Sequence, residues 1–346
     1  MEASRPEVVS AADPVRPDAA PSSMRAVVQD RYGSAEVLRI GEVATPSAGP
    51  GEVLLRVHAA GIDRGTWHLL TGKPYLMRLM GFGVRGPKNR VPGLDVAGTV
   101  IAVGDAVTRF AVGDEVFGIS RGAFAEYAVA LEEKLARKPS NLTFEQAAVV
   151  PVSGLTAIQG LRDSSRVEAG QHVLIVGASG GVGTYAVQLA KAFGAQVTAV
   201  CSTAKVDLVR SLGADHVVDY TKEDFAAASH RYDLILDIGG NASIPRLRRA
   251  LAPRGTLVIV GGEDGGSVTG GFGRSLRAVA LSPFVRQRLT MLTNKEHYAG
   301  LEQLTELIEA GRVTPSIDST VSLDGVSDAL ARLESGSVRG KVAVSL

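Results

Sequence analysis

The sequence predicts an α/β protein in which a β-rich part is followed by a doubly wound parallel sheet. Between Met24 and Val150, short apolar runs alternate with Gly, Pro and Asp, as in a small antiparallel β domain or partial barrel. From Pro151 onward, apolar runs are separated by helix-length segments, as parallel βαβ units require. A chain of 346 residues is long enough for about two domains, so each part is expected to have its own core.

The individual elements follow from local patterns. In the β-rich part, residues 51–58 alternate between two faces, and the pairs Gly104-Asp105 and Gly113-Asp114 mark turns. In the second part we expect strands at residues 172–176, 196–200, 216–218, 234–236 and 256–260. A final helix is expected over residues 301–310, and a closing β segment over residues 340–346.

The helix after the first of these strands has a clear apolar face and a clear end. Ala186, Leu189, Ala190 and Phe193 follow helical spacing, so this face should pack on the sheet, and Gly194 should stop the helix. Residues 173–190 carry no charge and are long enough to be suspected of spanning a membrane. A glycine cluster divides them into strand, turn and helix, so the chain is expected to be cytoplasmic and soluble.

The N-terminal residues 1–23 are rich in Ala, Pro and Ser and lack the apolar centre of a signal peptide. They predict a flexible tail, and Met24 is a possible natural start because it opens the first strand-like run. The single cysteine, Cys201, excludes an intrachain disulfide and a thiolate-rich zinc site, and it suits a reducing, cytoplasmic location. We interpret Cys201 as packed at a strand end.

Charge gives no hint of a nucleic-acid or membrane partner. The 37 Lys plus Arg residues nearly balance the 36 Asp plus Glu residues, which leaves a formal net charge of +1. No global field therefore selects nucleic acid or an anionic membrane, and partners must be sought in local sites.

A glycine cluster at residues 177–183 lies between a predicted buried strand and a helix start. Missing side chains there let backbone N–H groups approach a pyrophosphate, and the helix N-terminus favours its negative charge. Ala178 replaces the first glycine of the usual pattern, so the βαβ context is the stronger signal. We expect Ser179, Gly180, Gly181 and Val182 to bind a dinucleotide. The alternative is a tight turn without a ligand.

The end of the second predicted strand decides which nucleotide is expected. Residues 200–205 contain no carboxylate that would bind a ribose 2′-hydroxyl and repel a 2′-phosphate. Ser202 offers a hydrogen bond and Lys205 a positive charge, which together suit a phosphate. The sequence therefore predicts NADPH as the cofactor. The alternative is that Lys205 is a solvated residue that opens the next helix.

Several spaced motifs resemble one family. They lie at residues 51–61, 92–100, 113–116, 124–127, 154–157 and 178–183. Together they resemble the zinc-independent quinone oxidoreductases of the medium-chain dehydrogenase/reductase superfamily. Within that group the chain looks closest to the branch with mitochondrial reticulon-interacting oxidoreductases and plant alkenal or enone reductases.

The resemblance implies a Rossmann domain inserted into a GroES-like, β-rich catalytic domain, with the cofactor in the cleft between them. The catalytic domain would comprise residues 24–150 and 294–346, and the Rossmann domain residues 151–293. By the same resemblance, Tyr220 matches a tyrosine that contacts the 2′-phosphate. The positions that contact the ribose and nicotinamide are matched by Thr156, Ile238, Gly239, Val260 and Gly261.

Zinc is not expected. Zinc-dependent relatives use Cys, His and a further Cys or Asp, but the matching positions here are Asp63, Leu94 and Val152, which cannot hold the metal. Without a Lewis acid, hydride addition to a simple ketone loses its main means of stabilising the alkoxide. A hydrophobic conjugated carbonyl, such as an enone, or a quinone is the expected substrate because its negative charge spreads to oxygen.

The sequence leaves two candidates for the residue that donates a proton to the substrate. Asp63 would donate only if protonated, and hydrogen bonding to backbone or ribose is its simpler role. His68 is a possible acid or a structural residue. Many family members have Asn, Asp and often Tyr where this chain has Asp63, Thr66 and His68, so the family's roles do not transfer directly.

Residues 73–90 mix large apolar groups, glycines and basic residues. They are a candidate lid in which Tyr75, Leu76 and Phe82 line the substrate pocket, with Tyr75 a further catalytic candidate. A solvated loop or a dimer contact is the alternative. A homodimer is expected through a free sheet edge near residues 286–292.

Two other functions are kept beside the quinone or enone reductase. One is a non-catalytic, crystallin-like protein that binds NADPH as a sensor or partner-binding module. The other is a reductase dedicated to one biosynthetic intermediate. Turnover of a substrate panel would distinguish the first of these from an enzyme.

Overall fold

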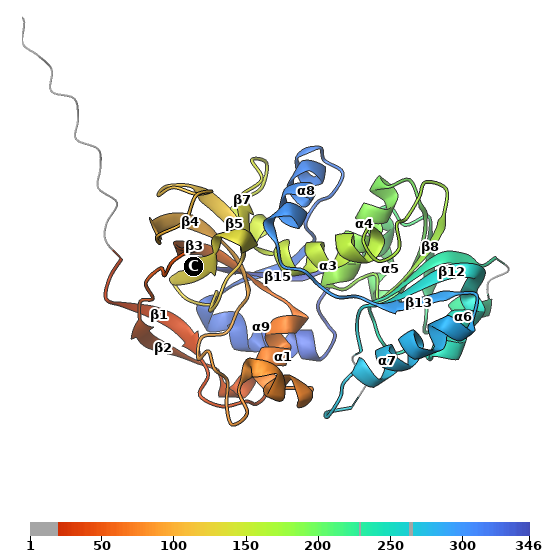
Figure 1. Ribbon diagram of the computed structural model, residues 1–346, viewed down its shortest axis with the longest axis horizontal. Coiled ribbons are helices and arrows are strands. Elements are labelled where there is room, and N and C mark those ends of the chain that lie inside the picture. The colour runs from red at the N-terminus through yellow and green to blue at the C-terminus, as the bar shows by residue number, and fades with distance from the viewer. Residues whose placement is uncertain (1–19, 228–229, 263–265) are drawn as a thin grey trace, which may run out of the picture.

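The computed structural model describes residues 20–227, 230–262 and 266–346. Of the predicted N-terminal tail, residues 1–19 lie outside the described part. Figure 1 shows two large sheets side by side, with α3 (Pro151–Leu161) between them. A small ribbon of β1 (Ser23–Val28) and β2 (Arg39–Ala44) flanks the first sheet.

The second sheet is a parallel sheet of six strands in the order β10-β9-β8-β11-β12-β13. Every pairing in it is parallel, which confirms the doubly wound fold. Its strands are β8 (His172–Val176), β9 (Gln196–Cys201), β10 (His216–Asp219), β11 (Tyr232–Asp237), β12 (Leu251–Ile259) and β13 (Arg288–Met291). Its connecting helices are α4 (Gly181–Ala192), α5 (Val206–Ser211), α6 (Ile244–Ala250) and α7 (Phe272–Leu281).

Strand β8 and helix α4 follow directly from the local pattern. Val173, Leu174 and Ile175 are fully buried because a parallel sheet is covered on both faces. Ala186, Leu189 and Ala190 of α4 are also fully buried, as their spacing predicts. The helix ends before Gly194, whose φ of 84° is a conformation that glycine adopts without strain.

The predicted strand at residues 256–260 differs from β12 at both ends. Strand β12 begins earlier, at Leu251, which pairs with Tyr232 before the register shifts and Thr256 pairs with Leu234. Val260 follows the strand instead of closing it. An irregular pairing of this kind leaves no period-two signal in the sequence.

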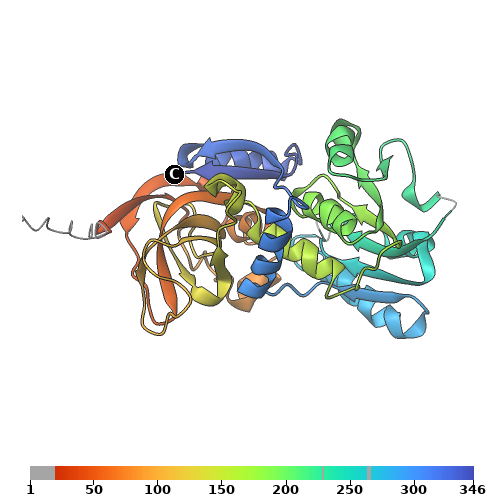
Figure 2. The ribbon, with the colours of Figure 1, turned by 90° about the horizontal axis from the view of Figure 1, so that it is seen from above.

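The first sheet has the order β14-β15-β3-β4-β5-β7, and β6 also pairs with β3. Its last strand along the chain, β15, runs antiparallel to β3, so the chain returns to this sheet as expected. Figure 2 shows this C-terminal segment lying against the N-terminal strands. The strands are β3 (Glu52–Ile62), β4 (Asp95–Val103), β5 (Glu115–Ile119), β6 (Tyr127–Leu131), β7 (Leu135–Arg137), β14 (Ile317–Ser322) and β15 (Lys341–Ser345).

The predicted alternation of residues 51–58 is only partly realised in β3. Val53, Leu55 and Val57 are buried on one face, but Leu54 on the other face is buried too. Leu54 packs in a separate apolar cluster with Met24 and Tyr127, so both faces of this central strand are covered.

One apolar cluster spans both sheets. It joins Ala97 and Phe117 of the first sheet to Val173 and Ile175 of the second. The remaining helices are α1 (Arg64–Thr71), α2 (Phe144–Ala148), α8 (Tyr298–Glu309) and α9 (Val326–Glu334). Among the described residues, none of the helices combines the length and apolar character needed to cross a membrane.

Candidate functional site

A cleft of about 390 Å³ lies between the two sheets. Its lining combines the start of α1, the start of α3, the first turn of α4 and the carboxyl ends of β11 and β12. In open α/β sheets, ligands bind beyond the carboxyl ends of the strands. Residues predicted from distant parts of the sequence meet here: Asp63, His68, Thr156, Val182, Ile238, Val260 and Gly261.

The glycines between β8 and α4 have different roles. A Cβ on Gly183 would lie 2.2 Å from the Gly177 carbonyl oxygen, and one on Gly177 would lie 2.9 Å from the Gly239 nitrogen. These two glycines therefore permit close packing of backbone on backbone. A Cβ on Gly180, the N-cap of α4, would meet no atom closer than 3.7 Å. Open space at Gly180, at the N-terminus of α4, fits a pyrophosphate.

Gly181 has a role that the glycine pattern does not reveal. A Cβ there would lie 2.9 Å from Cδ of Lys341 and 3.0 Å from Oγ of Ser153. The missing side chain thus makes room for the lysine stem of β15. The adjoining backbone is tied as well, since Gly340 N–H donates to the Ser179 carbonyl at 2.8 Å.

Lys341 forms a buried ion pair with Asp95. Its ammonium donates to Oδ2 of Asp95 at 2.9 Å, and the Lys341 and Asp95 side chains are 1% and 0% exposed. The other carboxylate oxygen accepts from Val152 N–H at 2.8 Å, at the start of α3. Burial raises the pKa of Asp95 to about 7, although Lys341 opposes this effect and Asp63 adds to it.

Sequence reasoning missed this pair. The only signal was the occurrence of one charged residue in each of two apolar runs, residues 92–98 and 341–344. A charged residue in such a run is buried only with a partner, but nothing local identifies that partner.

The expected 2′-phosphate residues lie beyond the ends of β9 and β10. Ser202 follows β9, and Tyr220 follows β10 with its N–H donating to the Cys201 carbonyl at 3.1 Å. Lys205 is not simply solvated: its ammonium donates to the carbonyls of Gly336 and Val338 at 2.8 and 2.7 Å. Burial, followed by the neighbouring Arg339, lowers the pKa of Lys205.

A carboxylate does lie near this position, although none is present in residues 200–205. Asp219 ends β10 directly beside Cys201 of β9. Its oxygens accept hydrogen bonds from the hydroxyls of Thr203 and Thr221, which lower its pKa to about 2. These hydroxyls occupy lone pairs that a ribose 2′-hydroxyl would otherwise use. The sequence did not show this because parallel pairing alone brings the two strand ends together.

Asp63 and His68 are both engaged with backbone. Asp63 is the N-cap of α1 and accepts from Thr66 N–H at 2.8 Å. His68 Nδ1 lies 2.7 Å from the Lys73 carbonyl, so this nitrogen carries the hydrogen and Nε2 remains for another partner. Both side chains line the cleft.

Tyr75 and Leu76 do not line the cleft, in contrast to the lid hypothesis as first stated. Their N–H groups donate to the carbonyls of Ser267 and Val268 at 2.8 and 3.1 Å, and their side chains are exposed. Tyr75 stacks on the Arg78 guanidinium, 4.6 Å from the ring centroid. Pro74 and Met77 line the cleft instead, and Phe82 lines a neighbouring hollow with Leu69, Leu94 and Ile119.

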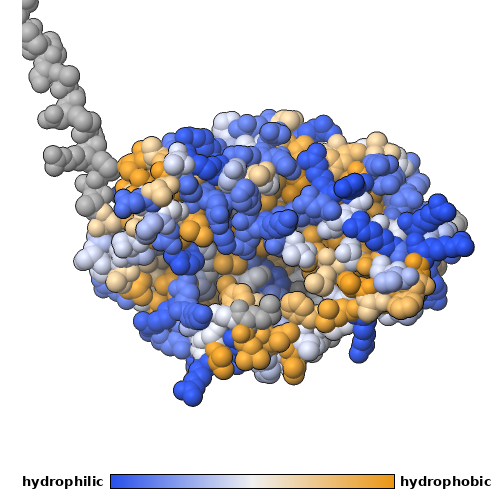
Figure 3. Space-filling model, viewed as in Figure 1, coloured by the Kyte–Doolittle hydropathy of each residue, from blue (hydrophilic) through white to orange (hydrophobic). Residues whose placement is uncertain are grey.

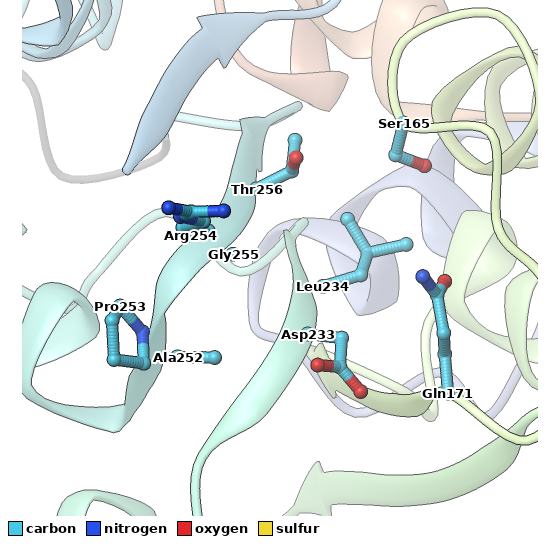
Figure 4. A pocket seen from close by; sticks show the side chains of 9 residues that line it. All are labelled: Ser165, Gln171, Asp233, Leu234, Ala252, Pro253, Arg254, Gly255 and Thr256. Atoms are coloured by element: carbon cyan, nitrogen blue, oxygen red, sulfur yellow. The ribbon is translucent and has the colours of Figure 1, made fainter. Parts of the chain in front are cut away.

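Another hollow lies at the other end of the parallel strands, near the amino ends of β11 and β12 (Figure 4). It is lined by residues at the starts of β11 and β12, including Asp233, Arg254 and Thr256. Asp233 already accepts from His172 N–H at 2.9 Å. No loop from the first sheet reaches this hollow, so it lacks the two-sided lining of the cleft.

Potential metal ligands do not gather in the described part of the chain. No three His, Cys, Asp or Glu side chains there lie close enough together to hold a metal ion. Cys201 is buried at the end of β9, as its position in the sequence predicts.

Known proteins with similar sequences are oxidoreductases. Residues 49–140 match the family model "Alcohol dehydrogenase GroES-like domain", and residues 212–344 match "Zinc-binding dehydrogenase". The 2-methylene-furan-3-one reductase of Solanum lycopersicum is 34% identical over 94% of this chain and 79% of its own. The chloroplastic NADPH-dependent alkenal/one oxidoreductase of Arabidopsis thaliana is 35% identical over 97% of this chain and 83% of its own.

A solved structure of the same family also has this fold. The quinone oxidoreductase from Coxiella burnetii superposes with a TM-score of 0.83 at 28% identity, covering 94% of this chain and 99% of that one. The sequence motifs, the parallel sheet joined to a GroES-like sheet and these similarities agree. The chain therefore belongs to the quinone oxidoreductase type of the medium-chain dehydrogenase/reductase superfamily, and it is an oxidoreductase.

Proposed function

We propose that this protein is an NADPH-dependent reductase that transfers hydride to a quinone or an α,β-unsaturated carbonyl without a metal ion. One observation carries the proposal: the glycine turn at residues 177–183 and the cleft meet at Val182, in the first turn of α4. A dinucleotide whose pyrophosphate lies at Gly180 and Gly181 would thus reach the cleft with its nicotinamide. Bound NADPH would supply the hydride from its nicotinamide ring.

Residues on three elements suit the nicotinamide half. Thr156 of α3, Ile238 after β11 and Val260 after β12 line the cleft. A Cβ on Gly261 would lie 2.0 Å from the Ile238 carbonyl oxygen, so this glycine permits close backbone packing, whereas a Cβ on Gly239 would meet no atom closer than 3.7 Å. We assign residues 151–293 to the nucleotide-binding domain and residues 24–150 and 294–346 to the catalytic domain. The cofactor would then lie between domains.

The 2′-phosphate would lie among Ser202, Lys205 and Tyr220, with Arg339 as an additional cation. Arg339 comes from the loop before β15, so sequence spacing did not suggest it. The name of the Arabidopsis relative, which specifies NADPH, supports this choice of nucleotide. The positive charges favour a phosphate, and Asp219 is already bound by two threonines.

The substrate end is mainly apolar. Met77, Phe272 and Leu292 line it, and His68 is the polar group best placed to act on substrate. Nδ1–H of His68 donates to a carbonyl, so Nε2 would donate a proton to the carbonyl oxygen of the reduced acceptor only when the imidazole ring carries both protons. Asp63 is the weaker donor candidate because its oxygens accept hydrogen bonds from Thr66.

The absence of a zinc requirement rests on the chemistry of the donor set. Leu94 and Val152 offer no ligand atom in their side chains, and Asp63 alone cannot hold a tetrahedral zinc ion. An acceptor whose charge spreads by conjugation is therefore preferred over a saturated ketone. The names of the relatives, which specify furanone, alkenal or quinone substrates, support this class.

Residues 73–90 would act as a lid. The hydrogen bonds from Tyr75 and Leu76 to Ser267 and Val268 join the catalytic part to the nucleotide-binding part across the cleft. Opening the cleft would break both bonds and withdraw Pro74 and Met77 from its wall.

The remaining expectations are a homodimer and a cytoplasmic location. Strand β13 ends the parallel sheet and offers an unpaired edge to a second copy near residues 286–292. The single, buried cysteine suits a reducing compartment. Light scattering and localisation of the native protein would test these two points.

The main test is NADPH oxidation with a quinone, an enone and the matching saturated ketone. We expect turnover with the first two only, and no effect of a chelator. His68→Gln should lower kcat by at least about tenfold, as loss of an acid commonly does, while NADPH affinity stays unchanged. Complete inactivity with tight NADPH binding would favour the non-catalytic binding protein, and loss of activity on chelation would contradict the metal-free mechanism.

A further inference from the structure

Exposed apolar side chains gather around the mouth of the cleft. One run follows α1 and contains Tyr75, Leu76, Leu79, Phe82 and Val84, whose exposed fractions range from 37% to 74%. The other lies before and along α7 and contains Val268, Phe272, Leu276 and Val279. We call these nine residues the rim patch. Figure 3 shows hydrophobic side chains gathered at the lower edge of this face, below α1 in Figure 1.

The two runs adjoin each other. Backbone hydrogen bonds join Tyr75 and Leu76 to Ser267 and Val268, and Pro74 packs against Gly270. Pro74 and Phe272 also line the cleft, so the rim patch borders its entrance directly. A contiguous exposed apolar surface of this kind usually marks an interaction site.

The two described segments that carry the rim patch contain cations and no acidic residues. Residues 73–90 contain Lys73, Arg78, Arg85, Lys88 and Arg90 and no acidic residue. Residues 266–288 contain Arg274, Arg277, Arg286 and Arg288, again without an acidic residue. Glu263 and Asp264 precede the second run and lie outside the described residues.

Some of these cations are already used within the fold. Arg78 donates to the Gly72 carbonyl, Arg90 pairs with Asp30, and Arg274 pairs with Asp237. The side chains that remain at the surface, without a carboxylate partner among the described residues, include Lys73, Arg85, Lys88 and Arg277.

The combination of exposed apolar side chains and nearby cations indicates which kind of partner the rim patch binds. In a two-fold dimer formed through the rim patch, the same surface would face itself, so cations would oppose cations. An anionic bilayer instead offers an apolar interior for the side chains and negative headgroups for the flanking cations. We propose that the rim patch binds the surface of membranes that contain anionic lipids, with the cleft entrance facing the lipid.

The proposal differs from the expectation of no membrane partner, which rested on a net charge of +1 for the whole chain. A local group of cations acts within roughly 10 Å at moderate salt, so distant acidic residues do not cancel it. The proposed contact is peripheral and needs no membrane-spanning helix. It also does not depend on the reaction in the cleft.

Co-sedimentation of the full chain with lipid vesicles tests the proposal. We expect strong binding to vesicles of phosphatidylcholine and phosphatidylglycerol in equal parts at low salt. Vesicles of phosphatidylcholine alone should bind at least about tenfold less, and high salt should release the protein. Neither NADPH nor substrate is needed, so the result is separate from the proposed reductase activity.

Matched variants assign the binding to the rim patch. The double variant Leu79→Glu/Leu276→Glu and the double variant Arg85→Glu/Lys88→Glu should each reduce binding to anionic vesicles by at least about tenfold. None of these four residues lines the cleft. The controls Val103→Glu/Val112→Glu and Arg166→Glu/Arg254→Glu change exposed residues elsewhere and should bind as the wild type does. Melting curves would verify that all variants fold.

Two results would overturn the proposal. One is the absence of binding to anionic vesicles by the folded wild type at any salt concentration. The other is unchanged binding by a folded Leu79→Glu/Leu276→Glu variant. If the wild type binds no vesicles and light scattering shows a dimer that this variant converts to a monomer, the rim patch is instead an interface between copies of the chain.

Discussion

The two ends of the cleft are built in different ways. At the nucleotide end, one continuous run, residues 172–183, supplies the strand, the turn and the helix start. At the substrate end, contacts join residues far apart in the chain, such as Tyr75 with Ser267. The nucleotide end therefore depends on local backbone geometry, whereas the substrate end depends on how the two sheets pack.

Lys341 connects these two ends. Its stem fills the space left by the missing side chain of Gly181, and its ammonium reaches Asp95 of the first sheet. Asp95 in turn binds the N–H of Val152, which lines the cleft. If the two ends of the cleft are built in these different ways, a substitution at Lys341 should disturb both the nucleotide end and the substrate end. A substitution in the glycine turn should disturb mainly the nucleotide end.

The largest effect is expected for Lys341→Met. This change leaves the Asp95 carboxylate buried without its counter-charge, so the free energy of unfolding should fall by about 3–5 kcal/mol. Lys134→Met is the control, because the pair of Lys134 with Glu296 is partly exposed and should contribute about 1 kcal/mol or less. Urea denaturation measures both. Equal losses in the two variants would show that Lys341 has no special role.

The glycine turn provides the next test. In Gly183→Ala the new Cβ would meet the Gly177 carbonyl, and because backbone cannot easily give way we expect a loss of about 1–3 kcal/mol. In Gly180→Ala the Cβ meets open space, so the unfolding free energy should change by about 0.5 kcal/mol or less.

Gly180→Ala should still weaken NADPH binding, since the proposed pyrophosphate site lies at this position. Calorimetric titration of this variant measures the effect without interference from folding. Unchanged NADPH affinity would mean that the nucleotide does not approach Gly180.

A smaller effect is expected at the substrate end. Asp63→Ala removes the N-cap of α1 and should cost about 1 kcal/mol of unfolding free energy. Asp63→Asn keeps a capping oxygen and should retain both stability and turnover. A large fall in kcat for a stable Asn variant would instead identify Asp63 as the proton donor.

The last effect is a pH dependence of stability that arises from Asp95. Burial raises the pKa of Asp95 from 3.8 to about 7 in the folded protein, so the folded state holds its proton more tightly than the unfolded state does. The contribution of Asp95 to stability is therefore fully present below the unfolded value and is lost as pH rises through about 7. The melting temperature of the wild type should fall relative to that of Asp95→Asn as pH rises from about 4 to about 7. A constant difference would contradict this assignment.

The sequence predicted the structure best in the region where the site is formed by the local backbone. Strand β8 has the predicted bounds, 172–176, and α4 buries the predicted face. The departures occur where side chains from different strands meet. Asp219 lies beside Cys201 only because β10 pairs with β9, and Lys205 is bound by carbonyls near Val338, more than a hundred residues later.

By itself, the sequence determined the two-part α/β fold and the glycine turn, because hydrophobic period and glycine spacing act over a few residues. Only the tertiary structure decided that Lys341 pairs with Asp95, 246 positions away, and that Tyr75 faces outward. The physical reason is that a buried charge or an exposed ring depends on which distant surfaces pack together.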